Sequence, residues 1–307
     1  MQEFIRQIRT SLNMSQEDFA KHLNVSFSTV NRWENGHAMP NKLAQGQIYS
    51  LCRQNSVPGF NMILQRIANI AGTLQTDSNR IILYHGSKSG IEGTIEPRSR
   101  RQCDFGKGFY MGTDPAQAMT LICDYEKAKF YIVSIDVTHL AKIEIPADID
   151  WAMLVAYNRG RMEAISGTSL YRKYRDMTAD KDLIIGSIAN DRMFYVIDNF
   201  FIGNITDAAL VHSLSALRLG KQYVAVSRKA CDAVRIECEF EFSHLERLFI
   251  QEVSEGNRAN GISLANTICK NYRREGLFFD EILNRATLEE SEARDETSEK
   301  ETEGGEQ

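Results

Sequence analysis

The sequence predicts a multidomain protein, with an all-α N-terminal domain, an α+β domain and a helical C-terminal appendage. Residues 1–70 carry apolar side chains at helical spacing, with capping residues between the runs. Short apolar runs typical of strands follow, and helix-like stretches separate them. Because strands and helices do not alternate regularly, an α+β arrangement is favoured over a doubly wound sheet.

The composition is that of an ordinary globular protein, with 43% apolar and 25% charged residues among 307. No window approaches the roughly 18 continuous apolar residues of a membrane span, and the N-terminus does not resemble a signal peptide. We therefore expect a cytoplasmic protein without a membrane partner. The six cysteines lie far apart, which predicts free, mostly buried thiols and no metal site.

Charge is distributed unevenly along the chain. Residues 289–307 hold nine acidic and two basic residues, a charge of −7, whereas the whole chain carries −5. Residues 1–71 hold seven basic and four acidic residues, a charge of +3. The basic head suggests a nucleic-acid partner. The acidic tail lacks aromatic side chains, so we expect residues 287–307 to be disordered.

Within residues 1–70, two short helices are joined by a tight turn. Ser15 caps the first helix and Asn24 ends it. Ser26 caps the second, over residues 27–35, and Gly36 ends it. This is the geometry of a helix-turn-helix, whose second helix enters the major groove of DNA.

The stretch from Ser15 to Gly36 closely resembles the lambda-repressor-like (XRE) DNA-binding family. The resemblance implies that Val30 and Trp33 are core residues and that the domain binds operator DNA. Because this family reads two half-sites, it also implies a homodimer. The alternative is a small helical module that binds another protein. The side chains that the resemblance directs to DNA are Gln16, Ser26, Phe27, Ser28, Asn31 and Arg32.

After the head, residues 71–80 are small and polar, which predicts a linker. The α+β domain is expected over residues 81–242 and a helical appendage over residues 243–286. Strand-like runs occupy residues 81–85, 130–137, 142–145, 223–226 and 234–242. Helix-like stretches occupy residues 115–123, 151–159, 191–201 and 206–217.

Two fragments of the α+β domain predict a pocket for a flat, polar ligand. Residues 81–87 are an apolar run that presents His85 near its end. Residues 105–113 are a glycine-rich turn in which Gly106 and Gly108 let the backbone approach a ligand, and Tyr110 supplies a flat ring. From these residues alone, the alternative is a hydrogen-bonded core histidine and a packing aromatic.

Residues 84–87 and 105–110 together resemble the first two motifs of ADP-ribosyltransferases of the diphtheria toxin and poly-ADP-ribose polymerase class. In that family a histidine, a tyrosine after a glycine-rich turn and a glutamate that opens a late strand follow in this order. Gln222 stands in the place of the glutamate. The resemblance implies a split β-core, NAD as the ADP-ribose donor, and His85, Tyr110 and Gln222 as catalytic residues.

The resemblance also implies individual roles. His85 would hydrogen-bond a ribose hydroxyl, the Gly86 backbone would hold the nicotinamide amide, and Tyr110 would stack on the nicotinamide ring. Gln222 can make the hydrogen bond of the family glutamate but cannot supply its charge or act as a base. Residues 190–192 open a helix, whose N-terminus attracts anions. The implied NAD-binding residues are His85, Gly86, Ser87, Lys107, Tyr110, Asn190, Asp191 and Arg192.

A further helix-like stretch ends on Asn158 and Arg159, followed by Gly160. This string and residues 186–193 resemble an uncharacterised bacterial subgroup of the same transferase superfamily. The resemblance brings Asn158 and Arg159 into consideration as site residues. The alternative for each string is a capped helix with a solvated charge.

Three functions remain open from the sequence. The first is a mono-ADP-ribosyltransferase that modifies a macromolecular acceptor and regulates its own expression, in a toxin–antitoxin or defence locus with an antitoxin partner. Without the family glutamate, such an enzyme would use an acceptor that needs no general base, or another carboxylate such as Asp191 would replace the glutamate. The second is a repressor whose cleft senses NAD without turnover. The third is a scaffold that binds a partner protein and neither DNA nor NAD.

Overall fold

The computed structural model describes residues 1–74, 79–188, 191–216, 220–272 and 274–303. The chain forms two compact units. Unit 1 comprises residues 1–93, 114–135 and 235–256, and unit 2 comprises residues 94–113, 136–234 and 257–307.

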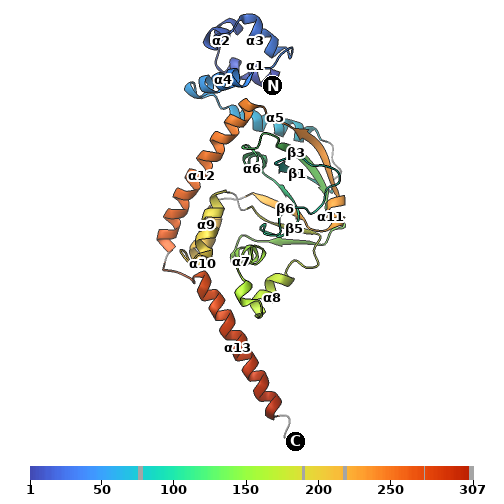
Figure 1. Cartoon of the computed structure of the whole chain (residues 1–307), viewed down its shortest axis with the longest axis vertical. Coiled ribbons are helices and arrows are strands. Elements are labelled where there is room, and N and C mark those ends of the chain that lie inside the picture. Colours follow the sequence, from blue (N-terminus) through green and yellow to red (C-terminus); the bar gives the residue numbers. More distant parts are fainter. Residues whose placement is uncertain (75–78, 189–190, 217–219, 273, 304–307) are drawn as a thin grey trace. The chain divides into compact units, whose positions relative to one another are not determined.

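Unit 1 begins with a helical head. The Ser15 hydroxyl accepts a hydrogen bond from the Asp18 amide, and the Ser26 hydroxyl accepts one from the Thr29 amide, so both predicted helix caps are formed. Asn24 in the turn has a φ of 51°, in the left-handed region that asparagine tolerates. The predicted helix-turn-helix is therefore confirmed. The helices of the head are α1 (Gln2–Ser11), α2 (Gln16–His22), α3 (Phe27–Glu34), α4 (Lys42–Gln54) and α5 (Gly59–Thr73) (Figure 1).

The rest of unit 1 contains β1 (Arg80–Ser87), α6 (Pro115–Thr120), β3 (Lys129–Asp136), β7 (Val234–Phe240) and the first part of α12 (His244–Tyr272). The strands lie in the order β1-β3-β7. One apolar cluster extends from the head to Phe130 in β3 and Phe249 in α12. The Phe249 ring packs edge-on against Phe4 of α1, at a centroid distance of 6.0 Å, and against Tyr49 of α4, at 5.1 Å. The start of α12 is thus part of the core of the head.

The predicted domain boundaries differ from these units. The predicted boundaries separate a head (residues 1–70) from an appendage (residues 243–286), but the two share a core. Gly59 at the start of α5 makes room for this contact, because a Cβ there would lie 2.5 Å from the Phe249 ring. Helix α5 also continues to Thr73, into the predicted linker over residues 71–80.

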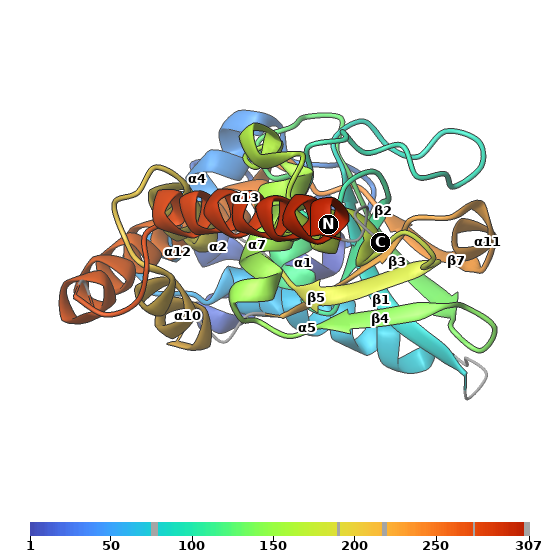
Figure 2. The same cartoon turned by 90° about the horizontal axis from the view of Figure 1, so that it is seen from below.

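Unit 2 holds four further strands, β2 (Phe109–Gly112), β4 (Lys142–Ile145), β5 (Leu183–Ser187) and β6 (Lys221–Ala225), in the order β4-β5-β6-β2. Strands β4 and β5 are parallel and lie side by side in Figure 2, whereas β6 is antiparallel to both β5 and β2. The sequence predicts only a turn at β2, because these four residues show no alternation of apolar and polar side chains.

The helices of unit 2 include α7 (Ile149–Asn158), which lies in the apolar core of the unit and whose residues 151–156 are all buried. This helix is apolar on every side, as expected for one enclosed by its neighbours. The others are η1 (Glu163–Ile165), α8 (Ser169–Asp176), α9 (Asp191–Phe201), α10 (Asp207–Ala216), α11 (Arg228–Asp232), the second part of α12 and α13 (Phe279–Glu303). Together the head and the mixture of helices and strands confirm the predicted multidomain layout.

Residues 287–303 of the acidic tail are helical rather than disordered, since α13 continues to Glu303. The prediction of disorder from residue 287 considered only charge and aromatic content, whereas glutamate, alanine and lysine also favour helix. Glu290 fastens this part of α13, because its carboxylate accepts hydrogen bonds from the Ser169 amide (2.8 Å) and the Arg172 guanidinium (3.1 Å).

Among the described residues, none of the helices is long and apolar enough to cross a membrane. The five cysteines with described side chains are free thiols, and Cys52, Cys123 and Cys231 are buried. The side chain of Cys269 lies outside the described part of the chain.

Candidate functional site

The face of α3 that was predicted to contact DNA is open to solvent. Phe27 is 49% exposed, which is unusual for a large aromatic side chain, and Arg32 is exposed one turn further along the helix. Ser26 and Ser28 are exposed at the start of α3, and Asn31 is partly buried. These side chains share one side of the helix, as a helix that reads DNA requires.

Beneath that face, α3 is fixed by its core and by a buried ion pair. Val30 and Trp33, predicted as core residues, are 0% and 5% exposed. Glu34 is 2% exposed and accepts hydrogen bonds of 2.6 and 3.1 Å from Arg9 of α1. Burial opposes ionisation of Glu34, but the hydrogen bonds from Arg9 and Gln16 outweigh it and hold its pKa below the usual value.

Gln16, predicted to contact DNA, is also tied to this ion pair. Its amide nitrogen donates to Glu34 (2.7 Å), and its amide oxygen lies 3.4 Å from Nδ2 of Asn31. Gln16 thereby links α2 to α3 and orients Asn31. Glu34 is not among the residues predicted from the sequence, although a carboxylate next to the core residue Trp33 was a usable signal.

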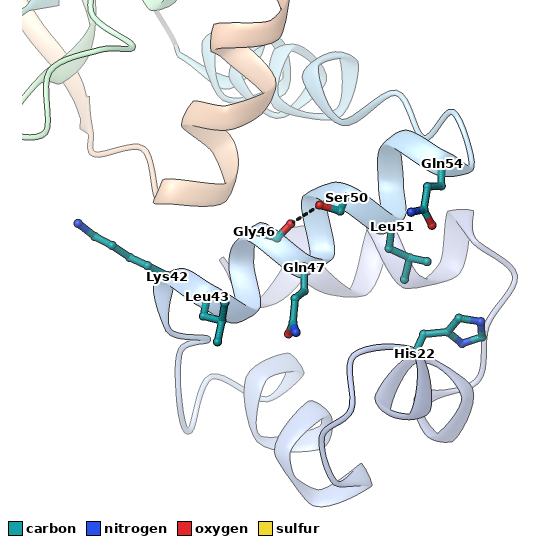
Figure 3. A pocket seen from close by; sticks show the side chains of 8 residues that line it. All are labelled: His22, Lys42, Leu43, Gly46, Gln47, Ser50, Leu51 and Gln54. Carbon is teal, nitrogen blue, oxygen red and sulfur yellow. Dashed lines mark hydrogen bonds between the residues drawn. The ribbon is translucent and has the colours of Figure 1, made fainter.

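An open hollow of about 580 Å³ lies along α4 (Figure 3). Leu43, Gln47 and Leu51 project from one face of α4, on the side of His22. Lys42 is paired with Glu126 at 2.6 Å, so the hollow offers little charge to a nucleotide phosphate. The lining residues are His22, Lys42, Leu43, Gly46, Gln47, Ser50, Leu51 and Gln54.

The first predicted NAD motif lies at the end of β1, in unit 1. The His85 ring is 6.0 Å from the Tyr131 ring and tilted by 40° to it. Gly86 is required by packing, because a Cβ there would lie 2.5 Å from the backbone oxygen of Ala118 in α6. The Ser87 hydroxyl donates to a backbone carbonyl 2.8 Å away. Gly86 and Ser87 thus have local structural roles, and the ligand roles of all three remain predictions.

The second and third predicted motifs lie on paired strands of unit 2. In the antiparallel pair of β2 and β6, Tyr110 is opposite Val224 and Gly112 is opposite Gln222. Because side chains alternate along a strand, Tyr110 and Gln222 project from the same face. On the other side of β6, Gly186 of β5 is opposite Gln222. Gln222 therefore has a glycine beside it on each neighbouring strand.

Tyr110 is held in place by the glycine-rich turn that precedes it. Its hydroxyl donates to the Gly106 carbonyl (2.8 Å) and accepts from the Phe105 amide (3.1 Å). Gly106 has a φ of 74°, a conformation that favours glycine. Burial, with the neighbouring Cys103, raises the pKa of Tyr110 far above its usual value, so the phenol is neutral. Lys107, in the same turn, is exposed.

Gln222 is 6% exposed, and its amide nitrogen donates to the Ser187 carbonyl at 2.9 Å. The Trp151 indole N–H donates to the same carbonyl at 3.2 Å. No residue in the described part of the chain donates a hydrogen bond to Oε1 of Gln222. This oxygen can therefore accept a hydrogen bond from a ligand hydroxyl.

A buried acid that the sequence analysis missed, Asp104, adjoins Gln222. Asp104 is 8% exposed, and its carboxylate accepts a hydrogen bond of 2.7 Å from Arg159. Its backbone carbonyl accepts one of 3.0 Å from Asn158. Burial raises the pKa of Asp104, against the charge and hydrogen bond of Arg159 and a weaker hydrogen-bonding contact with Gln222. The available signal was an acid inside the basic stretch 98–107.

The remaining predicted residues are at the start of α9. Asn190 lies outside the described residues, and so do the side chains of Asp191 and Arg192. Asp104 is thus a carboxylate next to Gln222 that the structure does describe. Among the described side chains, no three histidines, cysteines or acids come together as a metal site.

Comparison with known proteins matches two parts of the chain. Residues 5–43 match the family described as helix-turn-helix (HTH_3), so the head is a helix-turn-helix domain that binds DNA. Residues 81–236 match the family described as protein of unknown function (DUF3990). No curated protein and no solved structure matches the chain.

Proposed function

The chain belongs to the family of proteins of unknown function DUF3990, which covers residues 81–236, about half of its length, and we propose that it is an NAD-dependent mono-ADP-ribosyltransferase. Its acceptor is a macromolecule, and its DNA-binding head regulates its own expression. The proposal is carried by the common face of Tyr110 and Gln222. These residues belong to separate motifs of the transferase resemblance, and they project from neighbouring strands.

The side chains of unit 2 suit the nicotinamide ribose of NAD. The Tyr110 hydroxyl is tied to the backbone, and its partly buried ring packs against the core of unit 2, so the part of the ring that remains exposed is a fixed flat surface for stacking. Oε1 of Gln222 is an acceptor for a ribose hydroxyl. His85, Gly86, Ser87, Lys107 and residues 190–192 are assigned to the same ligand by the resemblance alone.

When bound, NAD supplies the ADP-ribosyl group: the bond from the sugar to nicotinamide breaks, its electron pair leaves with nicotinamide, and the acceptor bonds the same carbon and loses a proton. Tyr110 and Gln222 hold ring and sugar in position for this exchange. Gln222 cannot take the proton from the acceptor. The site therefore favours an acceptor that needs no general base, and single transfers over chain elongation.

The helix-turn-helix domain adds a DNA partner to this activity. A single helix-turn-helix domain contacts one half-site, and two copies are needed for both half-sites of an operator. We therefore propose that the chain binds operator DNA as a homodimer. Regulation of expression by the enzyme's own DNA-binding head suits a toxic transferase. We propose that an antitoxin partner inhibits the transferase.

Incubation of the full-length chain with NAD labelled in its adenylate part, together with cell extract, tests the proposal. We expect free nicotinamide and label on a protein or nucleic acid. A chain that retains its melting transition but yields neither product would overturn the proposal.

The glutamine at position 222 favours a second candidate, a repressor that senses NAD without turnover. In that case NAD binds intact and changes the affinity for operator DNA. Introducing the family glutamate, Gln222→Glu, would then create turnover in a site that lacks only its carboxylate.

A further inference from the structure

The surroundings of Gln222 call for a hydrogen-bond donor. Its Nε2 faces the Ser187 carbonyl at 2.9 Å, and its amide contacts the Asp104 carboxyl. A glutamate at this position would place an anionic oxygen against a carbonyl oxygen and beside a second carboxylate. Both contacts are repulsive, so an amide suits this position better than a carboxylate.

A negative charge that could replace that of the family glutamate lies next to Gln222, in the segment that precedes β2. Asp104 precedes β2 in the glycine-rich turn, and its carboxylate is paired with Arg159 at 2.7 Å. Arg159 also lies 3.6 Å from the exposed carboxylate of Asp198 in α9. One guanidinium between two carboxylates leaves these three groups with a net charge of −1.

We propose that Asp104 is a positioning residue that supplies the negative charge of the site and acts through Gln222. This inference rests on the proposed transferase function. The Gln222 amide nitrogen donates to the Ser187 carbonyl and lies beside Asp104, which directs Oε1 away from both and toward a ligand hydroxyl. Asp104 forms no bond and exchanges no proton. Its charge stabilises the positive charge that develops on the sugar as nicotinamide leaves with the bonding electron pair.

A purely structural role for Asp104 leads to different expectations. Through Arg159 and Asn158, Asp104 also fastens the glycine-rich turn to the end of α7. If that were its whole role, its loss would lower the melting temperature and raise KM for NAD. An electrostatic role lowers kcat and leaves KM nearly unchanged, because the charge acts on the transition state.

Nicotinamide release by the full-length chain, measured over a range of NAD concentrations, separates these roles. We expect Asp104→Asn to lower kcat by about 10²–10³-fold, the usual effect of removing one preorganised stabilising group. KM should change by no more than roughly threefold. The matched control is Asp176→Asn, which removes an exposed carboxylate paired with Arg175 at 2.7 Å, away from Gln222, and should keep the wild-type rate. Melting temperatures show whether each variant is folded.

A second variant decides the question even if Asp104→Asn does not fold. Gln222→Glu keeps the Asp104–Arg159 pair but brings two carboxylates together, so we expect a lower kcat than in the wild type. A higher kcat in Gln222→Glu, or a wild-type kcat in Asp104→Asn, would overturn the inference and leave the transferase function standing. If the wild-type chain releases no nicotinamide, the proposed function fails, and the inference fails with it.

Discussion

The side-chain oxygen of Gln45 in α4 accepts a hydrogen bond of 2.8 Å from the backbone amide of Leu245, in the first turn of α12. The amide nitrogen of Gln45 donates to the Pro40 carbonyl at 2.7 Å. Gln45 is 6% exposed, so both bonds are shielded from water. The first amides of a helix have no partner within the helix, and Gln45 supplies one from the DNA-binding head.

We expect Gln45→Ala to lower the free energy of unfolding by on the order of 1–3 kcal/mol, because it leaves a buried amide and a buried carbonyl without partners. Urea denaturation of the full-length chain measures this. Gln47→Ala, on the exposed side of the same helix, is the control and should change stability by less than about 0.5 kcal/mol. Equal effects of the two substitutions would show that the contact with α12 contributes nothing.

The helix-turn-helix was predictable because its information is local. Ser15 and Ser26 cap their own helices, and Asn24 adopts the turn conformation within its own segment. The contact of Gln45 with Leu245 was not predictable in this way. A contact between residues 200 positions apart cannot be inferred from a single sequence. From the sequence alone, the polar Gln45 would be expected at the surface.

Acidification should lower the free energy of unfolding of the head, because Glu34 becomes protonated. The pKa of Glu34 is lower in the folded than in the unfolded protein, so its stabilising contribution is complete above the unfolded pKa, about 4.3. The contribution is lost as pH falls through the lower, folded pKa. Glu34→Gln should cost about 3 kcal/mol at neutral pH, because Arg9 loses its buried partner, and should flatten this acid limb.

Unfolding free energy measured from pH 7 down to pH 3 checks that expectation. Glu17→Gln is the control, since Glu17 is an exposed acid on α2. An acid limb that persists unchanged in Glu34→Gln would assign the pH dependence to other carboxylates.

Arg32 lies on the exposed face of α3, and its side chain should contribute directly to DNA affinity. Loss of a base or phosphate contact costs about 1–3 kcal/mol, so we expect Arg32→Ala to weaken binding by about 5–150-fold. A DNA site selected from a random pool by the wild type serves as the probe, and affinity is measured at several salt concentrations. Arg53→Ala, on α4, should bind like the wild type. If the two arginines behave alike, α3 is not the reading helix.

The Tyr110 ring and its hydroxyl should have separable roles. Tyr110→Phe keeps the ring but loses the bonds to Gly106 and Phe105, so we expect NAD affinity within a few-fold and a loss of about 1 kcal/mol in stability. Tyr110→Ala removes the stacking surface as well and should weaken NAD binding by at least about tenfold. Calorimetric titration with NAD measures both. Tyr223→Ala, which alters the opposite face of β6, is the control and should bind NAD normally.

Only those residues of the candidate site that lie in short, contiguous sequence motifs were predictable. Tyr110 follows two glycines, and Gln222 opens a strand, so both stood out in the sequence. Asp104 did not, because its burial depends on Arg159, 55 residues later, which closes over it from the end of α7. In the sequence alone, Asp104 was one acid within a basic, exposed loop.

Nicotinamide release from NAD by the purified full-length chain tests the central claim most directly. We predict release by the wild type, a rate at least tenfold lower in Tyr110→Ala, and a wild-type rate in Tyr223→Ala. Absence of release from a wild-type chain that melts cooperatively, or equal rates in all three proteins, would contradict the claim that the face shared by Tyr110 and Gln222 carries out ADP-ribosyl transfer.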